Sequence, residues 1–440
     1  MNKIYLTLLL LAFASGVFSQ NNRPMNKDYY ANEWAKVAEF EQKSLPQSAS
    51  EAVSNILRKA IEDKNSPQVI KALIHQGKYD LALDAQNDTL IFRNLNEMLE
   101  KSSDVVEQSV LHSMLGELYL QYYQKDRWNI DQRTELGDFV PADMKEWTRN
   151  IFFNKVVEHL NASVAPEEEL VKVKVESYAA VVELGKDSRR FYPSMYDFLE
   201  RRTIELSGQI DQDEDLSRLL AKKNISQESL FATADKFVNL SFDPQPGEYG
   251  VLENYKKYLT SLLGRGMRQS VLLTELDKLD YLGRLNNAYE AHALLSLETL
   301  LKEWEGEEFS VEIIDKLCDF YLREIGLIND EDTIQKKEKT GEMYQLLKKS
   351  ITAFPKYERI SILQNRLSRL IQPSFTVTGA NTFPKEGRKE LKVNFRNVQS
   401  LTAKLYRINS PLEVLEEKSK VRNGIAEMRV LIGEIPISLP

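Results

Sequence analysis

The chain has 440 residues, 42% of them hydrophobic, which is enough apolar material for a large core and a length typical of roughly two to three domains. Its formal charge at pH 7 is −8 and no cluster of Lys and Arg stands out. Because DNA and RNA phosphates are neutralised by such clusters, nucleic acid is not expected as a partner. We expect an acidic, globular protein with neutral or basic partners.

The N-terminal residues have the features of a secretory signal. Lys3 supplies a positive charge, residues 4–13 form a short apolar stretch, and a small residue, Ser19, precedes Gln20. We therefore expect residues 1–19 to be a signal peptide and the mature protein to be exported, to the periplasm or the extracellular space. No cysteine lies near the cleavage point to carry a lipid. No later stretch approaches the roughly 18 apolar residues of a membrane span, so the mature chain should have none.

Two helical regions are predicted next, over residues 24–243 and 247–372. Apolar residues recur there every three or four positions, as on the buried face of an amphipathic helix. One stripe comprises Val106, Val110, Met114, Leu118 and Tyr122, and a second includes Ala288, Ala291, Leu295 and Trp304. Pro67 fits a first helical position and Pro166 marks a break. The Asp-Pro-Gln-Pro-Gly run at 243–247 is the best internal boundary.

Two phrases in these regions resemble the tetratricopeptide pattern, in which small residues let paired helices approach closely. Residues 115–119 read Leu-Gly-Glu-Leu-Tyr, and residues 351–355 read Ile-Thr-Ala-Phe-Pro, like the proline-terminated second helix of a repeat. Neither phrase recurs at the repeat length of about 34 residues. We therefore expect an irregular solenoid of helical hairpins.

At Pro373 the apolar period changes to two, which predicts strands. Residues 375–378 are β-rich, residues 383–387 have turn chemistry, and Val393 and Phe395 alternate with polar residues as in a half-buried strand. A turn at 397–400 leads to a strand with Leu401, Ala403 and Leu405 on one face, so an antiparallel meander is predicted. A charged segment at 413–420, a turn at 423–424 and two or three short strands within 428–437 should follow.

The β-region, residues 373–440, is short for a complete domain. An immunoglobulin-like sandwich needs about seven strands and about 100 residues. We therefore expect the start of a β-sandwich that is incomplete in this chain.

No catalytic, cofactor-binding or metal-binding residue is assigned. The four histidines, His75, His112, His159 and His292, are scattered along the sequence, and each is expected to be a helix-surface or packing residue. His292, between two alanines, ranks first among them for burial. Phosphate-loop, dinucleotide-binding and nucleophile-elbow motifs are absent from the sequence. The acidic run at 211–215 lacks the glycine of a calcium loop, and the acidic residues after Pro166 suit a helix N-terminus.

Cys318 and two aromatic clusters each have a structural and a functional interpretation. Cys318 lies at helical spacing among apolar residues, which favours a buried, inert thiol over a reactive one. The clusters could line a binding groove or form helix core, and core is favoured. They comprise Tyr119, Tyr122, Tyr123 and Trp128, and Phe191, Tyr192 and Tyr196.

Three more specific phrases carry a family resemblance that spans nearly the whole chain. They are residues 43–49 (Lys-Ser-Leu-Pro-Gln-Ser-Ala), residues 65–73 (Asn-Ser-Pro-Gln-Val-Ile-Lys-Ala-Leu), and residues 394–398 (Asn-Phe-Arg-Asn-Val) followed by Leu-Tyr-Arg-Ile at 405–408. With them the chain resembles the N-terminal portion of the alpha-2-macroglobulin-like proteins exported by bacteria of the Bacteroidetes type. The resemblance implies a helical prelude that leads into a series of macroglobulin β-sandwich domains.

The resemblance also implies a protease trap, in which a protease cuts a bait region and, in many members, a Cys-x-x-Gln thioester captures it. Cys318 is followed by Asp-Phe-Tyr, and no bait region is present, so no functional residue is carried over. We expect the chain to be a helical scaffold or interaction region. Proteases would be engaged through downstream domains, and envelope proteins are candidate partners of the helices.

The alternative is a stand-alone, exported, tetratricopeptide-like binding protein of a glycan or peptide uptake system. The aromatic clusters would form its groove. The missing lipid-attachment cysteine and the β-region favour the trap. An enzyme ranks last, because no constellation of nucleophile, base and metal is found.

Overall fold

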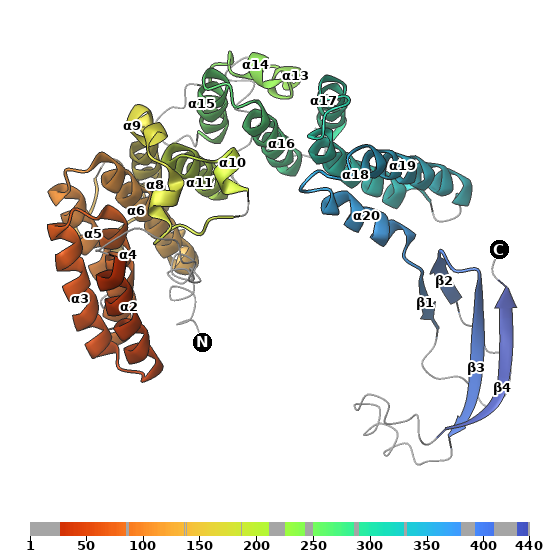
Figure 1. The fold of residues 1–440 in the computed structure, drawn as a ribbon, viewed down its shortest axis with the longest axis horizontal. Coiled ribbons are helices and arrows are strands. Elements are labelled where there is room, and N and C mark those ends of the chain that lie inside the picture. Colours follow the sequence, from red (N-terminus) through yellow and green to blue (C-terminus); the bar gives the residue numbers. More distant parts are fainter. Residues whose placement is uncertain are drawn as a thin grey trace. The chain divides into compact units, whose positions relative to one another are not determined.

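In the computed structural model the chain is mainly α-helical, with a small antiparallel strand region after the helices (Figure 1). The structure describes residues 27–84, 88–135, 137, 139–185, 187–210, 225–242, 250–285, 290–329, 332–379, 392–408 and 429–438. By its internal contacts the chain divides into two compact units, Met1–Lys302 and Glu303–Pro440. Several predicted features lie outside the described residues: the signal peptide (1–19), the acidic run (211–215), the boundary (243–247), and the segments 383–387, 413–420 and 423–424.

The helices of the first unit pack both against neighbours in sequence and against helices farther along the chain. They are α2 (Lys27–Gln42), α3 (Pro46–Glu62), α4 (Ser66–Leu83), α5 (Leu90–Lys101), α6 (Val105–Lys125), α7 (Arg127–Ile130), α8 (Arg149–Val164), α9 (Glu167–Lys172), α10 (Ser188–Phe191), α11 (Met195–Ile210), α13 (Gln227–Leu230), α14 (Ala234–Phe237), α15 (Val251–Gly264), α16 (Arg268–Leu285) and α17 (Glu290–Glu303), with 3-10 turns η1 (Met144–Glu146) and η2 (Val175–Tyr178).

Two helix starts confirm the sequence signals. Pro67 lies in the first turn of α4, where its missing N–H removes no helical hydrogen bond. Helix α9 begins directly after Pro166 and carries three glutamates in its first turn, next to the positive end of the helix dipole. The acidic run after Pro166 therefore has a structural explanation.

Helix α6 is buried against α8, and the first predicted stripe is confirmed. Four of its residues are buried and Tyr122 is half-buried. A Cβ at Gly116 would lie 3.0 Å from Cδ2 and 3.2 Å from Cγ of Leu160 on α8, so the glycine permits this close approach. In the chain, however, α7 and η1 lie between these two helices.

The second predicted stripe is wrong on α17. Ala291 and Leu295 are exposed, Leu295 by 63%, whereas the buried positions are Ala293, Leu297 and Leu300. Trp304 is buried as predicted, and Ala288 lies outside the described residues. The predicted stripe and the observed one both have helical spacing. The rotation of α17 about its axis buries the stripe of Ala293, Leu297 and Leu300, and it is held by a hydrogen bond of 2.6 Å from the Ser296 hydroxyl to the carbonyl of Phe231.

The second unit contains α18 (Ser310–Leu327), α19 (Thr333–Ala353) and α20 (Ser361–Ile371). The Phe309 ring lies 5.8 Å from that of Trp304 and 5.6 Å from that of Tyr357, which joins the start of α18 to the segment before α20. Arg366 of α20 forms ion pairs with Asp315 and Asp319 of α18. Helix α19 ends two residues before Pro355, as predicted.

Within the described residues, four strands follow: β1 (Ser374–Thr378), β2 (Lys392–Arg396), β3 (Ser400–Ile408) and β4 (Arg429–Ser438). They form two separate antiparallel sheets of two strands each, β1 with β2 and β3 with β4. Ser374 lies opposite Arg396 in the first sheet and Ser400 opposite Ser438 in the second. The predicted switch from helices to strands at Pro373 is confirmed.

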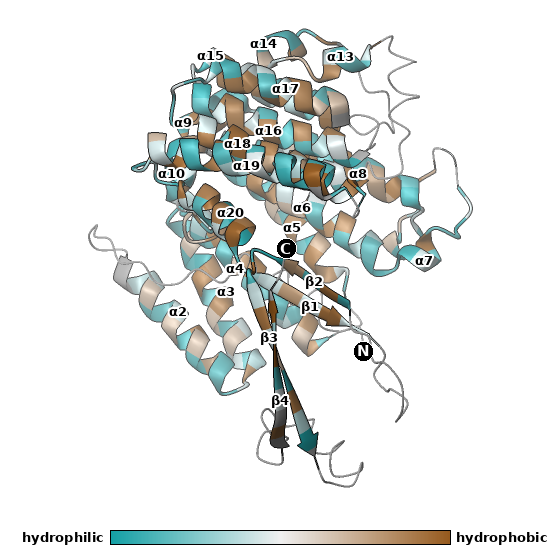
Figure 2. Cartoon of the chain, turned by 90° about the vertical axis from the view of Figure 1, so that its right-hand side faces the viewer, coloured by the Kyte–Doolittle hydropathy of each residue, from teal (hydrophilic) through white to brown (hydrophobic). Residues whose placement is uncertain are grey.

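The finer β prediction needs three corrections. First, β2 and β3 do not pair, so the described strands form no meander. Asn397 between them has a φ of 55° and donates to the carbonyl of Leu370 at 2.9 Å, so the turn is held against the end of α20 instead of closing a hairpin. Second, residues 429–438 form one long strand. Third, the apolar side chains of the strands are largely exposed, as with Phe395 at 37% and Leu405 at 59%. Figure 2 marks the hydrophobic positions along the strands in brown.

None of the helices in the described part of the chain is long and apolar enough to cross a membrane.

Candidate functional site: a polar cavity beside helix α11

Helix α11 is fixed at its N-terminus by a buried capping box. The Ser194 hydroxyl accepts a hydrogen bond from the backbone N–H of Asp197 at 3.2 Å. In return, the Asp197 carboxylate accepts from the backbone N–H of Ser194 at 3.0 Å and from its hydroxyl at 2.6 Å. This reciprocal pairing satisfies N–H groups that a helix start leaves open. It sets the direction in which the rest of α11 presents its side chains.

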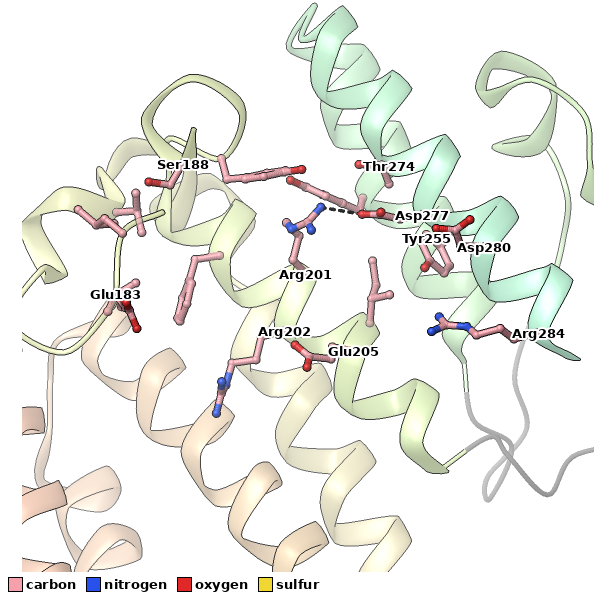
Figure 3. A pocket seen from close by; sticks show the side chains of 17 residues that line it. Glu183, Ser188, Arg201, Arg202, Glu205, Tyr255, Thr274, Asp277, Asp280 and Arg284 are labelled. Carbon is pink, nitrogen blue, oxygen red and sulfur yellow. Dashed lines mark hydrogen bonds and ion pairs between the residues drawn. The ribbon is translucent and has the colours of Figure 1, made fainter. Parts of the chain in front are cut away.

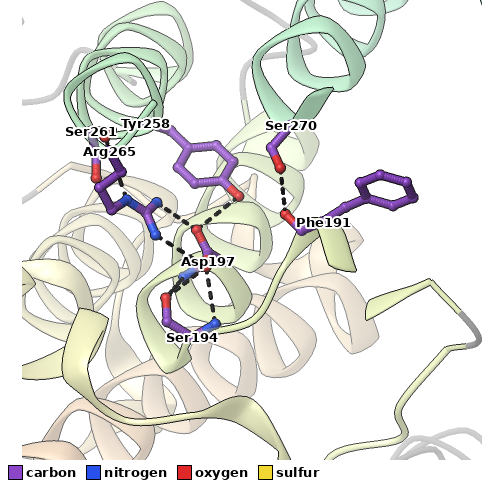
Figure 4. A network of polar contacts seen from close by, with 7 residues as sticks. All are labelled: Phe191, Ser194, Asp197, Tyr258, Ser261, Arg265 and Ser270. Atoms are coloured by element: carbon purple, nitrogen blue, oxygen red, sulfur yellow. Dashed lines mark hydrogen bonds and ion pairs between the residues drawn. The ribbon is translucent and has the colours of Figure 1, made fainter. Parts of the chain in front are cut away.

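The same carboxylate holds α15. Arg265 donates to Asp197 through Nη2 at 2.6 Å and Nη1 at 3.3 Å, and the Tyr258 hydroxyl donates at 3.3 Å (Figure 4). Burial holds the pKa of Tyr258 well above its usual value, so the phenol stays a hydrogen-bond donor. The Ser270 hydroxyl of α16 donates to the carbonyl of Phe191 at 2.8 Å. Helices α11, α15 and α16 are thus anchored around one segment, which positions the walls of a cavity.

A cavity of about 500 Å³ lies between α11, α15, α16 and the segment from η2 to α10 (Figure 3). Its volume falls within the roughly 300–1,000 Å³ of small-molecule sites. Two helix faces supply most of its polar groups, because their lining residues recur every three or four positions. They are Arg201, Arg202 and Glu205 on α11, and Thr274, Asp277, Asp280 and Arg284 on α16.

Two of the cavity's arginines are held by protein groups. Arg201 donates to Asp277 at 3.1 Å, and its guanidinium carbon lies 4.0 Å from the ring centroid of Tyr192, a cation–π distance. Arg202 lines the cavity as well and forms an ion pair with Glu117 of α6. The third, Arg284, is exposed at the opposite end of the α16 face.

Thr274, on the α16 face of the cavity, has a hydroxyl without a hydrogen-bond partner in the described residues. The residue is 1% exposed, and its Oγ1 is buried. A buried hydroxyl without a partner costs about 1–3 kcal/mol. Because this oxygen has almost no accessible surface, a molecule in the cavity would not reach it, and the unpaired hydroxyl is a feature of the helix packing.

Glu200 lies on another face of α11 and is fully buried. Neither of its carboxyl oxygens has a hydrogen-bond partner within the described residues. Burial raises the pKa of Glu200 to about 8; Lys257 opposes the shift and Glu167 adds to it. At neutral pH this carboxyl holds its proton, so it is a neutral group of the core.

The histidines are helix-surface or packing residues, as expected. Two that are 47 positions apart in the sequence, His112 and His159, lie together between α6 and α8 with their Nδ1 atoms 2.9 Å apart. His75 and His159 are buried, and burial lowers the pKa of each to about 4. His292, ranked first for burial, is only half-buried and stacks on Phe231. His292 lies between two alanines, and the sequence does not show which of them faces the core. The rotation of α17 about its axis therefore could not be predicted.

Cys318 and the aromatic clusters lie mainly in the core, as favoured. Cys318 is fully buried, and burial raises the pKa of its thiol to about 12. In the clusters, Tyr119, Tyr123, Phe191 and Tyr196 are buried. Trp128 is the exception at 80% exposed, and half-buried Tyr192 is the one cluster residue that lines the cavity.

Sequence reasoning missed the cavity. Thr274 and Asp277 lie more than 70 positions from Arg201 in the chain, and no local motif links them. The one signal was the Glu200-Arg201-Arg202 run, in which three charges interrupt a helix with an apolar stripe.

No family model matches the chain, and no curated protein or solved structure matches it either. In the described part of the chain, no group of three or more His, Cys, Asp or Glu side chains is placed to hold a metal ion.

Proposed function

We propose that the chain is the amino-terminal part of an exported, alpha-2-macroglobulin-like protease-trapping protein. In this proposal an irregular, tetratricopeptide-like solenoid of helical hairpins precedes the first macroglobulin-like β-sandwich. The helices act as a scaffold and interaction region. The sequence phrases at 43–49, 65–73 and 394–408 motivate the family.

The exposed apolar face of the strands carries the proposal. Isolated two-stranded sheets are marginally stable in water and need a further layer. Large apolar side chains are nevertheless exposed on all four strands: Phe375, Val377, Phe395, Leu405, Leu431, Ile435 and Ile437. A β-sandwich buries such side chains against a second sheet. The strands therefore suit a larger β-domain completed by further β-structure.

The helical packing supports the solenoid part of the proposal. In a solenoid each element packs on its sequence neighbours. Contacts between α2 and α3, α3 and α4, α4 and α5, and α5 and α6 follow this rule, as do those between α15 and α16. The pairing of α6 with α8 and the contacts of α11 with α6, α8 and α15 depart from this rule and make the array irregular.

The state of Cys318 supports a scaffold role without covalent chemistry in this chain. Its thiol is buried within α18 and its pKa is raised, so the reactive thiolate is disfavoured. The residues that follow it, Asp319-Phe320-Tyr321, do not form Cys-x-x-Gln.

The trap can be tested on the product of the complete reading frame. Incubation with a panel of endoproteases should produce one early cut and a more compact form by native electrophoresis and small-angle scattering. The protease should keep activity on a small peptide substrate and lose it on a large protein. Progressive degradation without compaction, with full activity on the large protein, would rule the trap out.

The cavity favours a second candidate, a stand-alone exported binding protein of a glycan or peptide uptake system. A volume of about 500 Å³ and a lining that combines charged side chains with the aromatic rings of Tyr192, Tyr255 and Tyr258 suit a small ligand. The two candidates make different demands: the second requires saturable ligand binding by the 440-residue chain itself.

A further inference from the structure

We propose that His112 and His159 form a proton-controlled latch between α6 and α8. A hydrogen bond between the two imidazole rings holds the helices together, and the latch opens when both rings carry a positive charge. The inference goes beyond the proposed function and depends on neither of its candidates. It rests on the geometry and the position of the ring pair.

The two rings meet nitrogen to nitrogen. Their Nδ1 atoms are 2.9 Å apart, which is a hydrogen-bond distance. The ring centroids lie 5.1 Å apart with the planes inclined by 45°, so the rings touch at their edges and do not stack. A neutral imidazole has one N–H donor and one acceptor nitrogen. One Nδ1 must therefore carry the hydrogen and the other must accept it, so the two histidines are different tautomers.

The pair lies in the most extensive helix–helix contact of the described chain, that of α6 with α8. His112 is one helical turn from Gly116, and His159 directly precedes Leu160, the residue on which Gly116 packs. His159 is 6% exposed, whereas His112 is half-buried. The hydrogen bond therefore acts where the two helices come closest, and its outer ring is open to solvent protons.

Protons act on such a coupled pair in two steps. The first enters at Nε2 of the ring that donates from Nδ1, so the hydrogen bond survives and becomes charge-assisted. His112 takes this proton because it is the more accessible ring. The second proton occupies the accepting Nδ1 of His159. Two N–H groups and two positive charges then face each other, and the contact is lost.

Burial dominates the protonation of the pair. It lowers the pKa of His159 to about 4 and lowers the pKa of His112 as well. Within the described chain, the charged groups that act on the rings are Glu158, which raises both pKa values, and Lys155, which lowers that of His159. These two side chains form an ion pair of 2.7 Å on α8 and so offset each other.

The helices packed around α6 and α8 contribute groups that keep their charge between pH 4 and 7. The Tyr119 ring of α6 lies 5.5 Å from that of His159, and its phenol is hydrogen-bonded to the neutral amide of Asn96 on α5. On α11, Arg202 is held in an ion pair with Glu117 of α6. Phenol and guanidinium groups do not titrate in this range, so the ring pair is the group that responds.

Nuclear magnetic resonance tests the hydrogen bond directly. The 440-residue protein is isotope-labelled at its histidine nitrogens alone, which gives signals from only four rings. At pH 7 one ring should carry its hydrogen on Nδ1, and coupling across the hydrogen bond should connect two Nδ1 signals. Two rings that both carry their hydrogen on Nε2 would overturn the latch.

Hydrogen exchange measures the opening. In the wild type, protection of the backbone amides of α6 and α8, corrected for intrinsic exchange, should fall by at least about tenfold between pH 7 and pH 5. His159→Asn keeps an acceptor at the position of Nδ1 and takes up no proton, so most of this pH dependence should disappear. The control is His292→Asn on α17, whose ring stacks on Phe231, and it should respond as the wild type does.

Two further results would overturn the proposal. An equal loss of protection in the wild type and in His159→Asn would mean that other groups open these helices. Zn²⁺ that raises the melting temperature of the wild type and not that of His159→Asn would assign the rings to a metal site instead. If His159→Asn fails to fold, His112→Asn, at the half-buried side of the pair, provides the same comparison.

Discussion

Asp197 and Glu200 lie three positions apart on α11 and are both fully buried, yet their environments differ completely. Asp197 accepts hydrogen bonds from Ser194, Tyr258 and Arg265, which stabilise its charge. Glu200 has no such partner within the described residues, and burial raises its pKa to about 8. The residue type and the helix position do not predict these environments, because the neighbours of each carboxyl come from distant parts of the chain.

Glu200 should make stability depend on pH. The native state holds its proton up to about pH 8, whereas the unfolded carboxyl releases it near 4.5. The contribution of Glu200 to the free energy of unfolding is therefore fully present below pH 4.5. As the pH rises from 4.5 to 8, the free energy of unfolding falls by at most about 5 kcal/mol. Glu200→Gln should remove this loss, so the difference in unfolding free energy between variant and wild type should grow across this range in urea titrations.

Glu205→Gln is the matched control, because Glu205 is exposed on the same helix. Its pH profile should parallel that of the wild type. The buried histidines act in the opposite sense: with the pKa of His75 and His159 lowered to about 4, they favour unfolding as the pH falls below about 6.5. A Glu200→Gln profile parallel to the wild type would mean that the carboxyl is ionised in the native state.

At the scale of elements, the period of apolar residues predicted the helices and the strands. It failed where more than one helix face or strand pairing was compatible with the same sequence pattern. The stripe from Val106 on α6 lies at largely buried positions, but α6 is also buried at Leu111 and Leu115, so most of its circumference is core and the stripe alone underestimates its burial. On α17 two stripes were available, and a hydrogen bond to Phe231 selects between them. The β2–β3 turn looked like a hairpin, but its Asn397 binds the end of α20, a contact that no local pattern encodes.

The close approach of α6 and α8 at Gly116 gives a test at this scale. Gly116→Val would force its side chain into Leu160, and the strain of overpacking should cost about 1–3 kcal/mol. Gly283→Val on α16 is the control, because a Cβ there meets no atom within 4 Å, and its stability should stay within about 0.5 kcal/mol of the wild type. Thermal and urea unfolding would measure both. Equal stabilities would mean that the helices separate without cost.

At the scale of the whole chain, the mainly helical class and the change to strands at Pro373 were predictable, because they depend on periodicity alone. The division at Lys302 was not, since it depends on which helices contact each other. The cavity was equally hidden, because it combines Arg201 of one helix with Thr274 and Asp277 of another.

The exposed strands should make the 440-residue chain self-associate. Leu405 and Ile435, each 59% exposed on the paired strands β3 and β4, should bind the dye ANS and favour oligomers in sedimentation velocity. The double variant Leu405→Lys/Ile435→Lys should reduce both signals. Leu327→Lys is the control, because Leu327 is 83% exposed at the end of a helix. A monomeric wild type that does not bind ANS would contradict the exposed β-face.

The burial of Cys318 has a practical consequence for kinetics. The sequence contains one thiol, and it lies inside the second unit, on α18. A thiol reagent can label the native protein at this residue only when that part of the chain opens, so the labelling rate reports the opening of the second unit and not that of the first. The chain thus carries a native probe for the local unfolding of its smaller unit, with no substitution required.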